Sequence, residues 1–223
     1  MRGDFLAVRF IFLCLIVSVI SGCSVQRPDA AFNSSGAKGK KHIRKGSAYR
    51  TPTPAIEPVR VDYLTLLSEV TNPQIYIYKE KRRLYLVQSN VVVRQYPITL
   101  GIHPVGNKQT AGDGRTPVGN FYICQKTPGE RSDEALFINY PNKRDAQRAL
   151  FSGIISPLQF KQILSAAETK TAPPWDTKLG GGVSICAEGG QDNAGHGDIE
   201  LYSSDMKELF EVASIGTPVH IRP

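Results

Sequence analysis

The side chains most capable of chemistry in this 223-residue chain lie between positions 186 and 200. His196, Asp198 and Glu200 alternate, so an extended segment would point all three to one side, where an imidazole and two carboxylates could hold a divalent cation. Cys186 and His196 could instead form a thiol–imidazole pair for nucleophilic catalysis. The simpler interpretation is that Cys186 is a small apolar filler and that the alternation arose by chance on a solvent-facing loop.

The first residues indicate export from the cytoplasm. Arg2 and Arg9 flank a short charged region, and residues 10–20 are almost entirely apolar. This run is about half of the ~20 residues that a membrane-spanning helix needs, so it is typical of a signal peptide. It ends in Ile-Ser-Gly-Cys, which resembles a bacterial lipobox. We therefore predict a lipoprotein signal peptide over residues 1–22.

The lipobox resemblance implies that Cys23 receives lipid and anchors the chain in the cell envelope, facing the periplasm. Ser24 follows it, where an aspartate would favour the inner membrane in enteric-type sorting, so the outer membrane is weakly favoured. A plain secretory signal or an anchor helix with a chance cysteine is the alternative.

Residues 23–72 are predicted to form a lipidated, basic and flexible tether. Most of this segment is rich in Ser, Gly, Pro, Lys and Arg, and it has too little apolar surface to offset the entropy of ordering. The basic cluster at residues 38–45 could contact anionic lipid or wall polymer, or it could only keep a linker soluble. The formal charge of the chain, +7, also suits nucleic acid, but the export signal excludes that partner.

The four cysteines have different expected fates. Cys14 leaves with the signal peptide, and Cys23 is the predicted lipidation site. Cys124 and Cys186 remain in an oxidising compartment, either as one disulfide or as free, buried thiols. No two cysteines have CxxC spacing, which excludes zinc-knuckle and thioredoxin motifs.

Residues 73–223 are predicted to form a mainly β domain with a few helices. Short alternating apolar runs begin at residue 74, with polar hairpin turns at residues 79–82 and 89–90. The predicted helix at residues 157–167 would turn Leu158, Ile163 and Leu164 inward. Residues 59–70 have a weak helical pattern. The further strands are expected over residues 119–126, 135–140 and 218–221, and the helices over residues 145–150, 157–167 and 204–212.

Residues 112–119, with the sequence GDGRTPVG, resemble the GDGRTPEG segment of the L,D-transpeptidase (YkuD-type) family. Further segments of this chain resemble family segments and occur in the same order as in the family, at residues 99–101, 104–108, 139–142, 173–181 and 205–219. The resemblance implies a β-sandwich-like pair of sheets that opens on one side as a substrate groove. It implies no cofactor and no metal, and it implies peptidoglycan stem peptides or a cell-wall enzyme as partners.

Active members of this family cross-link or edit peptidoglycan, using a cysteine thiolate that attacks a peptide carbonyl and a histidine base. This chain departs from the family at both positions. Cys186 occupies the place of the histidine, and Asp198, directly after Gly197, occupies the place of the nucleophile. Glu200 occupies a place where arginine is frequent.

These replacements predict a catalytically inactive domain. A carboxylate attacks an amide poorly and leaves the tetrahedral adduct more easily than an amine, so the adduct would collapse backwards. Loss of an activated nucleophile and its base removes several orders of magnitude of rate. An active transpeptidase or amidase built on Cys186 and His196 is the alternative, and a divalent-cation site at His196, Asp198 and Glu200 is the second.

Other residues in the resembling segments have structural interpretations. Asp113 and Arg115 are expected to fix the glycine-rich turn, and Trp175, after two prolines, is expected to be a packing anchor. His103 and His220 are expected to be surface or strand residues.

Overall fold

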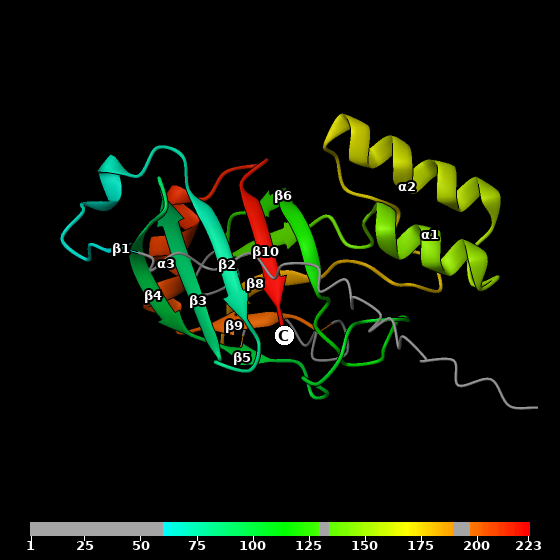
Figure 1. Ribbon diagram of the computed structural model, residues 1–223, viewed down its shortest axis with the longest axis horizontal. Helices are drawn as coiled ribbons and strands as arrows, with labels where there is room; N and C mark the ends of the chain where they lie inside the picture. Colours follow the sequence, from blue (N-terminus) through cyan, green and yellow to red (C-terminus); the bar gives the residue numbers. More distant parts are fainter. Residues whose placement is uncertain (1–59, 130–133, 190–196) are drawn as a thin grey trace, which may run out of the picture. The chain divides into compact units, whose positions relative to one another are not determined.

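The computed structural model describes residues 60–129, 134–189 and 197–223, which all belong to one compact unit of the chain (Figure 1). Ten strands form a mixed sheet, and three α-helices and one 3₁₀ helix accompany them in the described residues. This confirms the mainly β fold class with a few helices. The strands are β1 (Arg60–Val61), β2 (Gln74–Tyr78), β3 (Arg83–Gln88), β4 (Val91–Pro97), β5 (Thr99–Leu100), β6 (Gly119–Thr127), β7 (Ala135–Ile138), β8 (Ser184–Ala187), β9 (Ile199–Leu201) and β10 (Pro218–Arg222).

The two predicted hairpins are confirmed, and local sequence explains both. Ile75 and Ile77 of β2 alternate with half-buried residues, so every second side chain of the strand enters the core. The turn between β3 and β4 has Ser89 and Asn90 at φ of 49° and 63°. Two consecutive residues with positive φ match the right-handed twist of the flanking strands.

Strand β10 lies in the middle of the sheet, between β2 and β6. It pairs in parallel with β2 and antiparallel with β6. The first half of β6 pairs with β10 and its second half pairs with β7, with a register irregularity between Ile123 and Gln125. Figure 1 shows β8 and β9 behind β2, β3 and β10, and side chains from both groups of strands share one apolar core. Helix α3 (Ser203–Val212) contributes Met206 and Leu209 to that core.

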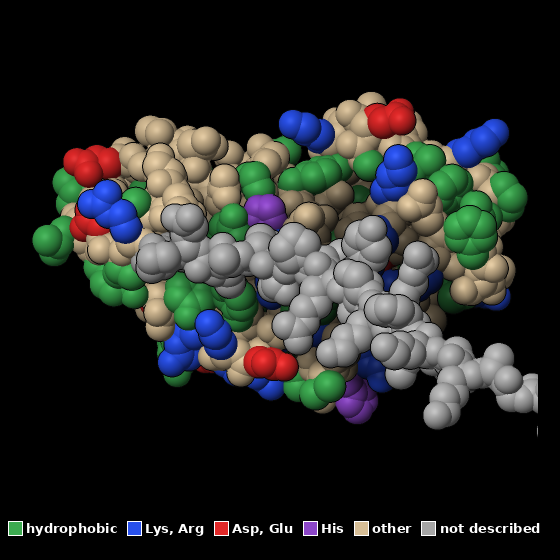
Figure 2. Space-filling model, in the orientation of Figure 1, with side chains coloured by type: hydrophobic (Ala, Val, Ile, Leu, Met, Phe, Trp, Pro, Cys, Tyr) green, Lys and Arg blue, Asp and Glu red, His purple; other side chains and the backbone are tan. Residues whose placement is uncertain are grey.

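Helices α1 (Lys143–Phe151) and α2 (Pro157–Thr169) form a hairpin with its own small core. Capping boxes begin both helices, at Asn142 and at Ser156. Ile163 is buried as predicted, but the prediction for Leu158 was wrong because its side chain is 67% exposed. Five residues on a helix correspond to a rotation of about 140°, so Leu158 cannot share the face of Ile163. Figure 2 shows apolar side chains exposed on this hairpin.

The helical prediction for residues 59–70 was also wrong. The described part contains β1, which pairs in parallel with β4, and only a 3₁₀ helix, Leu67–Glu69. The carboxylate of Asp62 accepts hydrogen bonds from the backbone of Leu64 and the hydroxyl of Thr65. Such a local side-chain turn competes with helix formation. Among the described residues, no helix is both long and apolar enough to cross a membrane.

Candidate functional site

The altered family positions lie on two neighbouring parallel strands. β8 and β9 pair with Ile185 opposite Ile199 and with Cys186 opposite Glu200. Ile185 and Ile199 point into the main core. Since side chains alternate along a strand, Ser184, Cys186 and Glu200 occupy the opposite face, and Asp198 contacts Ser184 there. The fold therefore brings Cys186, Asp198 and Glu200 together.

Cys186 is a buried thiol in an apolar environment. It packs in a small cluster with Cys124, Ala135 and Phe137. Burial raises the pKa of its thiol to about 11, a hydrogen bond with Ser184 lowers that pKa, and the charges of Asp198 and Glu200 raise it further. Reactive cysteines have lowered pKa values. The raised pKa of Cys186 therefore favours the interpretation of an inert thiol over that of a catalytic one.

The two cysteines of this cluster are both free, so of the two alternatives the structure supports buried thiols over a disulfide. Burial raises the pKa of the Cys124 thiol to about 12. Its sulfur donates to the carbonyl of Phe137 at 3.4 Å. Cys124 thus behaves as a small core residue.

Asp198 is held by its neighbour on β8. Its side chain is 3% exposed, and its Oδ1 accepts hydrogen bonds from the backbone N–H of Ser184 at 2.6 Å and from the Ser184 hydroxyl at 3.1 Å. Hydrogen bonds to a carboxylate stabilise its charged form and reduce its tendency to share electrons with an electrophile. Sequence reasoning missed Ser184, although its place two residues before Cys186 on one strand face was visible in the spacing.

Glycines fix the backbone next to Asp198. Gly197 has a φ of +84°, and a Cβ on it would lie 2.0 Å from the carbonyl oxygen of Arg115. A Cβ on Gly101 would lie 2.6 Å from the carbonyl oxygen of Gly114 and 3.0 Å from the Cα of Gly197. Three segments, around residues 101, 114 and 197, therefore meet through backbone contacts that larger residues would prevent.

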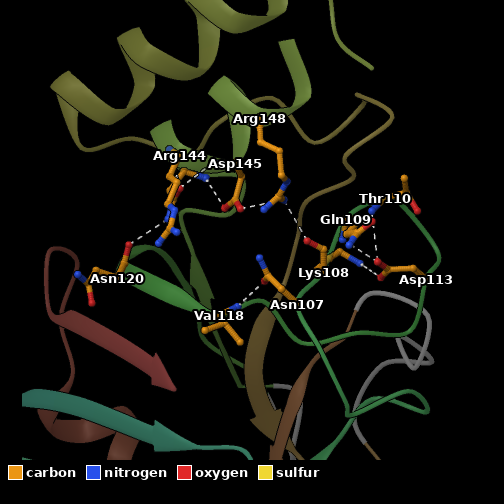
Figure 3. A network of polar contacts seen from close by, with 11 residues as sticks. Asn107, Lys108, Gln109, Thr110, Asp113, Val118, Asn120, Arg144, Asp145 and Arg148 are labelled. Atoms are coloured by element: carbon orange, nitrogen blue, oxygen red, sulfur yellow. Dashed lines mark hydrogen bonds and ion pairs between the residues drawn. The ribbon is translucent and has the colours of Figure 1, made fainter. Parts of the chain in front are cut away.

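The glycine-rich turn is organised by Asp113, which confirms its predicted structural role (Figure 3). One oxygen accepts from the ammonium of Lys108 at 3.0 Å and from the backbone of Arg115, and the other accepts from the backbones of Gln109 and Thr110. Burial alone would raise the pKa of Asp113, but these hydrogen bonds lower it overall. Lys108 is almost fully buried, so Asp113 neutralises an ammonium charge that is shielded from solvent.

Trp175 is a packing residue, as predicted. Its ring lies 5.2 Å from that of Phe137, and a Cβ on Gly181 would lie 2.2 Å from one of its ring carbons. Trp175 and Phe137 thus cover the thiol of Cys186 on the face away from the main core.

The histidine hypotheses are not supported by the described residues. His196 lies outside them, so neither its pairing with Cys186 nor its place in a cation site has been tested. Among the residues that the structure describes, no group of three histidine, cysteine or acidic side chains could hold a metal ion. His103 is exposed, and His220 of β10 lies beside the ring of Tyr76, as expected for a surface and a strand residue.

Comparison with known proteins matches residues 72–221 to the family described as the L,D-transpeptidase catalytic domain (YkuD). Similar solved structures include an L,D-transpeptidase from Xylanimonas cellulosilytica, at 15% identity over 68% of this chain and 61% of that one, with a TM-score of 0.42. A mutant of the helical cell shape determining protein Pgp2 from Campylobacter jejuni is 18% identical over 69% of this chain and 48% of that one, with a TM-score of 0.46.

A third solved structure, a mutant L,D-transpeptidase from Enterococcus faecium, is 17% identical over 69% of this chain and 50% of that one, with a TM-score of 0.38. The chain thus spans between about half and three fifths of the length of these proteins. No curated protein matched it. The family match covers most of the ordered strands and helices described above, and the chain belongs to the L,D-transpeptidase catalytic-domain (YkuD) family.

Proposed function

We propose that this chain is a cell-envelope lipoprotein whose YkuD domain binds peptidoglycan without cross-linking it. The observation that carries this proposal is the carboxylate of Asp198 at the family's nucleophile position, buried and hydrogen-bonded to Ser184. The residue at the position of the base, Cys186, cannot accept a proton as an imidazole does. Family membership supports a role on peptidoglycan, and the replaced side chains support the loss of catalysis.

The chemistry of the replaced nucleophile argues against acyl transfer. Attack of Asp198 on a peptide carbonyl would give an anhydride, and the carboxylate is a better leaving group than the amine it must displace. The adduct would return to the starting amide. Without the activated thiol and the imidazole, the domain lacks the two groups that account for most of the rate.

Binding without catalysis has two candidate partners in the wall. One is the peptidoglycan stem peptide, and the other is a cell-wall enzyme that the domain would assist. Glu200, next to Cys186, disfavours an acidic group at this point of the groove. A stem peptide would therefore bind with its acidic groups away from Glu200.

The envelope location rests on the signal peptide, the lipobox and Cys23, which lie outside the described residues. A lipid on Cys23, with the basic tether, would hold the domain close to the wall. Lipidation is checked by intact mass after membrane extraction, with Cys23→Ser as the variant that loses the anchor.

The catalytic part of the proposal is tested with the full chain in a nonionic detergent and a soluble disaccharide-tetrapeptide. Intact mass spectrometry should find no covalent adduct, and chromatography should find no cross-linked product. A variant with Cys186→His and Asp198→Cys, which returns the family pair, is assayed beside it. An adduct on the wild-type chain that disappears with Cys186→Ala would establish the rearranged enzyme instead.

The binding part is tested by co-sedimentation with purified peptidoglycan sacculi. We expect saturable binding that persists when Lys38, Lys40, Lys41, Arg44 and Lys45 are all replaced by glutamine. Binding that is lost in this tether variant would assign the interaction to basic charge in the tether and contradict a role for the domain.

A further inference from the structure

A cavity of about 540 Å³ lies in the domain and is separate from the altered catalytic positions. Three segments that are far apart in sequence supply most of its lining: the turn between β2 and β3, the loop at residues 104–107, and the start of α1 with Asn142 before it; Val118 and Pro223 complete it. Ser184, Cys186, Asp198 and Glu200 do not belong to its lining. The cavity therefore needs an explanation of its own.

The lining of this cavity contains more cationic than acidic side chains. Four cationic side chains line it, Lys79, Arg82, Arg144 and Arg148, against the two acidic side chains of Glu80 and Asp145. Figure 3 shows Arg148 extending from α1 toward Lys108, whereas Arg144 lies on the other side of Asp145. Cations from separate segments that line one cavity repel one another, and an anion would relieve that repulsion.

Lys79 is fixed in the cavity wall by the backbone. Its ammonium donates to the carbonyl of Gly106 at 2.5 Å and to that of Thr116 at 2.8 Å, and its side chain is buried. An ammonium has three N–H donors, so these two bonds leave one. Desolvation by burial lowers the pKa of Lys79 to about 8, and nearby Arg115 and Arg82 also lower it, whereas Asp113 raises it. At neutral pH the group is still mostly charged.

The acidic residues neutralise only part of this charge. One oxygen of Asp145 accepts from Arg148 at 3.1 Å, and the other accepts from the backbone of Asn142. Arg148 is therefore oriented by its partner. Within residues 60–129, 134–189 and 197–223, Arg82 and Arg144 have no ion-pair partner.

We propose that this cavity binds an oxyanion, a phosphate or a carboxylate carried on a small ligand, between Arg82, Arg144 and Lys79. The planar guanidinium groups match the paired oxygens of either anion, and the anchored ammonium adds a fixed point charge. The volume exceeds that of an oxyanion alone, and Pro104, Val105 and Val118 in the lining can contact the apolar part of the same ligand.

The proposal is tested by isothermal titration of the full chain, in detergent, with pyrophosphate and separately with citrate at about 150 mM salt. We expect saturable binding of at least one of these probes, and the tighter one identifies the phosphate or the carboxylate as the preferred group. The double variant Arg82→Gln with Arg144→Gln should weaken that binding by at least about 10-fold, because each lost bond is charge-assisted.

The matched control is Lys81→Gln with Lys143→Gln, which removes the same charge from neighbouring exposed residues outside the cavity lining. It should change the affinity by less than about 2-fold, since exposed charges are screened. If the double arginine variant does not fold, Arg144→Gln alone gives the same comparison with Lys143→Gln. Absence of saturable binding by either probe, or equal losses in the two double variants, would overturn the proposal.

Discussion

Two neighbouring segments of this domain use an aspartate in different ways. In the Asp113 turn (residues 107–118), the carboxylate neutralises Lys108 and accepts from three backbone amides. In the Asp198 segment (residues 197–201), the carboxylate accepts from the backbone and the hydroxyl of Ser184, at the place that we propose as the altered nucleophile position. The first aspartate holds its own turn together through four hydrogen bonds, whereas the backbone beside the second is fixed by the glycine contacts of Gly101 and Gly197.

The largest expected effect tests whether glycine packing maintains the Asp198 segment. Gly197→Ala should lower the free energy of unfolding by at least about 4 kcal/mol, because its Cβ would overlap the backbone of Arg115 and its φ is positive. Gly106→Ala is the control, with the same φ of +84° and no atom within 4 Å of the added Cβ. Gly106→Ala should lower the free energy of unfolding by only about 1 kcal/mol. Equal losses in urea unfolding would show that backbone strain, and not the contact with Arg115, is decisive.

The next effect tests the stabilising role of the Asp113 turn. Asp113→Ala would leave the buried ammonium of Lys108 without its partner, so we expect a loss of about 3 kcal/mol in chemical denaturation. The partly exposed pair of Arg94 and Glu208 gives the contrast. Glu208→Gln removes that ion pair but leaves an acceptor for Tyr96, and it should cost less than about 1 kcal/mol.

The acid dependence of stability checks the same carboxylate by another route. The folded-state pKa of Asp113 is lowered, so its contribution is fully present above the ordinary value of 3.8 and is lost as the pH falls through the lower folded-state pKa. The stability difference between the wild type and Asp113→Asn should therefore shrink as the pH falls below 3.8. A difference that stays constant down to pH of about 2 would contradict this assignment.

The sequence predicted those features that depend on neighbouring residues. Both hairpin turns were predicted because polar turn residues lie next to the apolar runs they limit, and the two helices were predicted from their apolar residues; their caps at Asn142 and Ser156 were not predicted. Leu158 was misplaced because it lies five residues, and so about 140° of rotation, from Ile163 on the helix. The family resemblance assigned Cys186 and Asp198 to the positions of the base and the nucleophile, and the parallel pairing of β8 with β9 puts these two positions close together.

The basic cavity could not be predicted in the same way. Lys79 and Arg82 were interpreted as part of the polar turn of a hairpin, and no sequence pattern singled out Arg144 or Arg148. Their convergence depends on the tertiary arrangement of segments more than 60 residues apart, which no local pattern records. Ser184 was missed for a different reason. A serine on a strand does not indicate a site until its hydrogen-bond partner, here Asp198, is known.

The reactivity of Cys186 distinguishes an inert thiol from a catalytic one. A pKa of about 11 reduces the thiolate fraction at neutral pH, while the greater nucleophilicity of a basic thiolate compensates for part of that loss. Labelling with iodoacetamide should therefore be at least about 10-fold slower than for free cysteine, and burial should slow it further. Peptide-level mass spectrometry separates Cys186 from Cys124. Faster labelling of Cys186 than of free cysteine would support the rearranged enzyme.

The smallest expected effect concerns the contact that most directly contrasts the two aspartates. Ser184→Ala removes the hydroxyl that donates to Asp198 and that also contacts Cys186, but it keeps the backbone N–H, which makes the shorter bond at 2.6 Å. We expect a loss of about 1 kcal/mol, typical of one hydrogen bond whose acceptor retains another donor. The same change removes an interaction that lowers the thiol pKa, so Cys186 should label still more slowly. Ser156→Ala, which removes the cap of the separate helix α2, should cost a similar amount without affecting that labelling. If Ser184→Ala leaves both stability and labelling unchanged, the Ser184 hydroxyl does not help to hold the Asp198 segment.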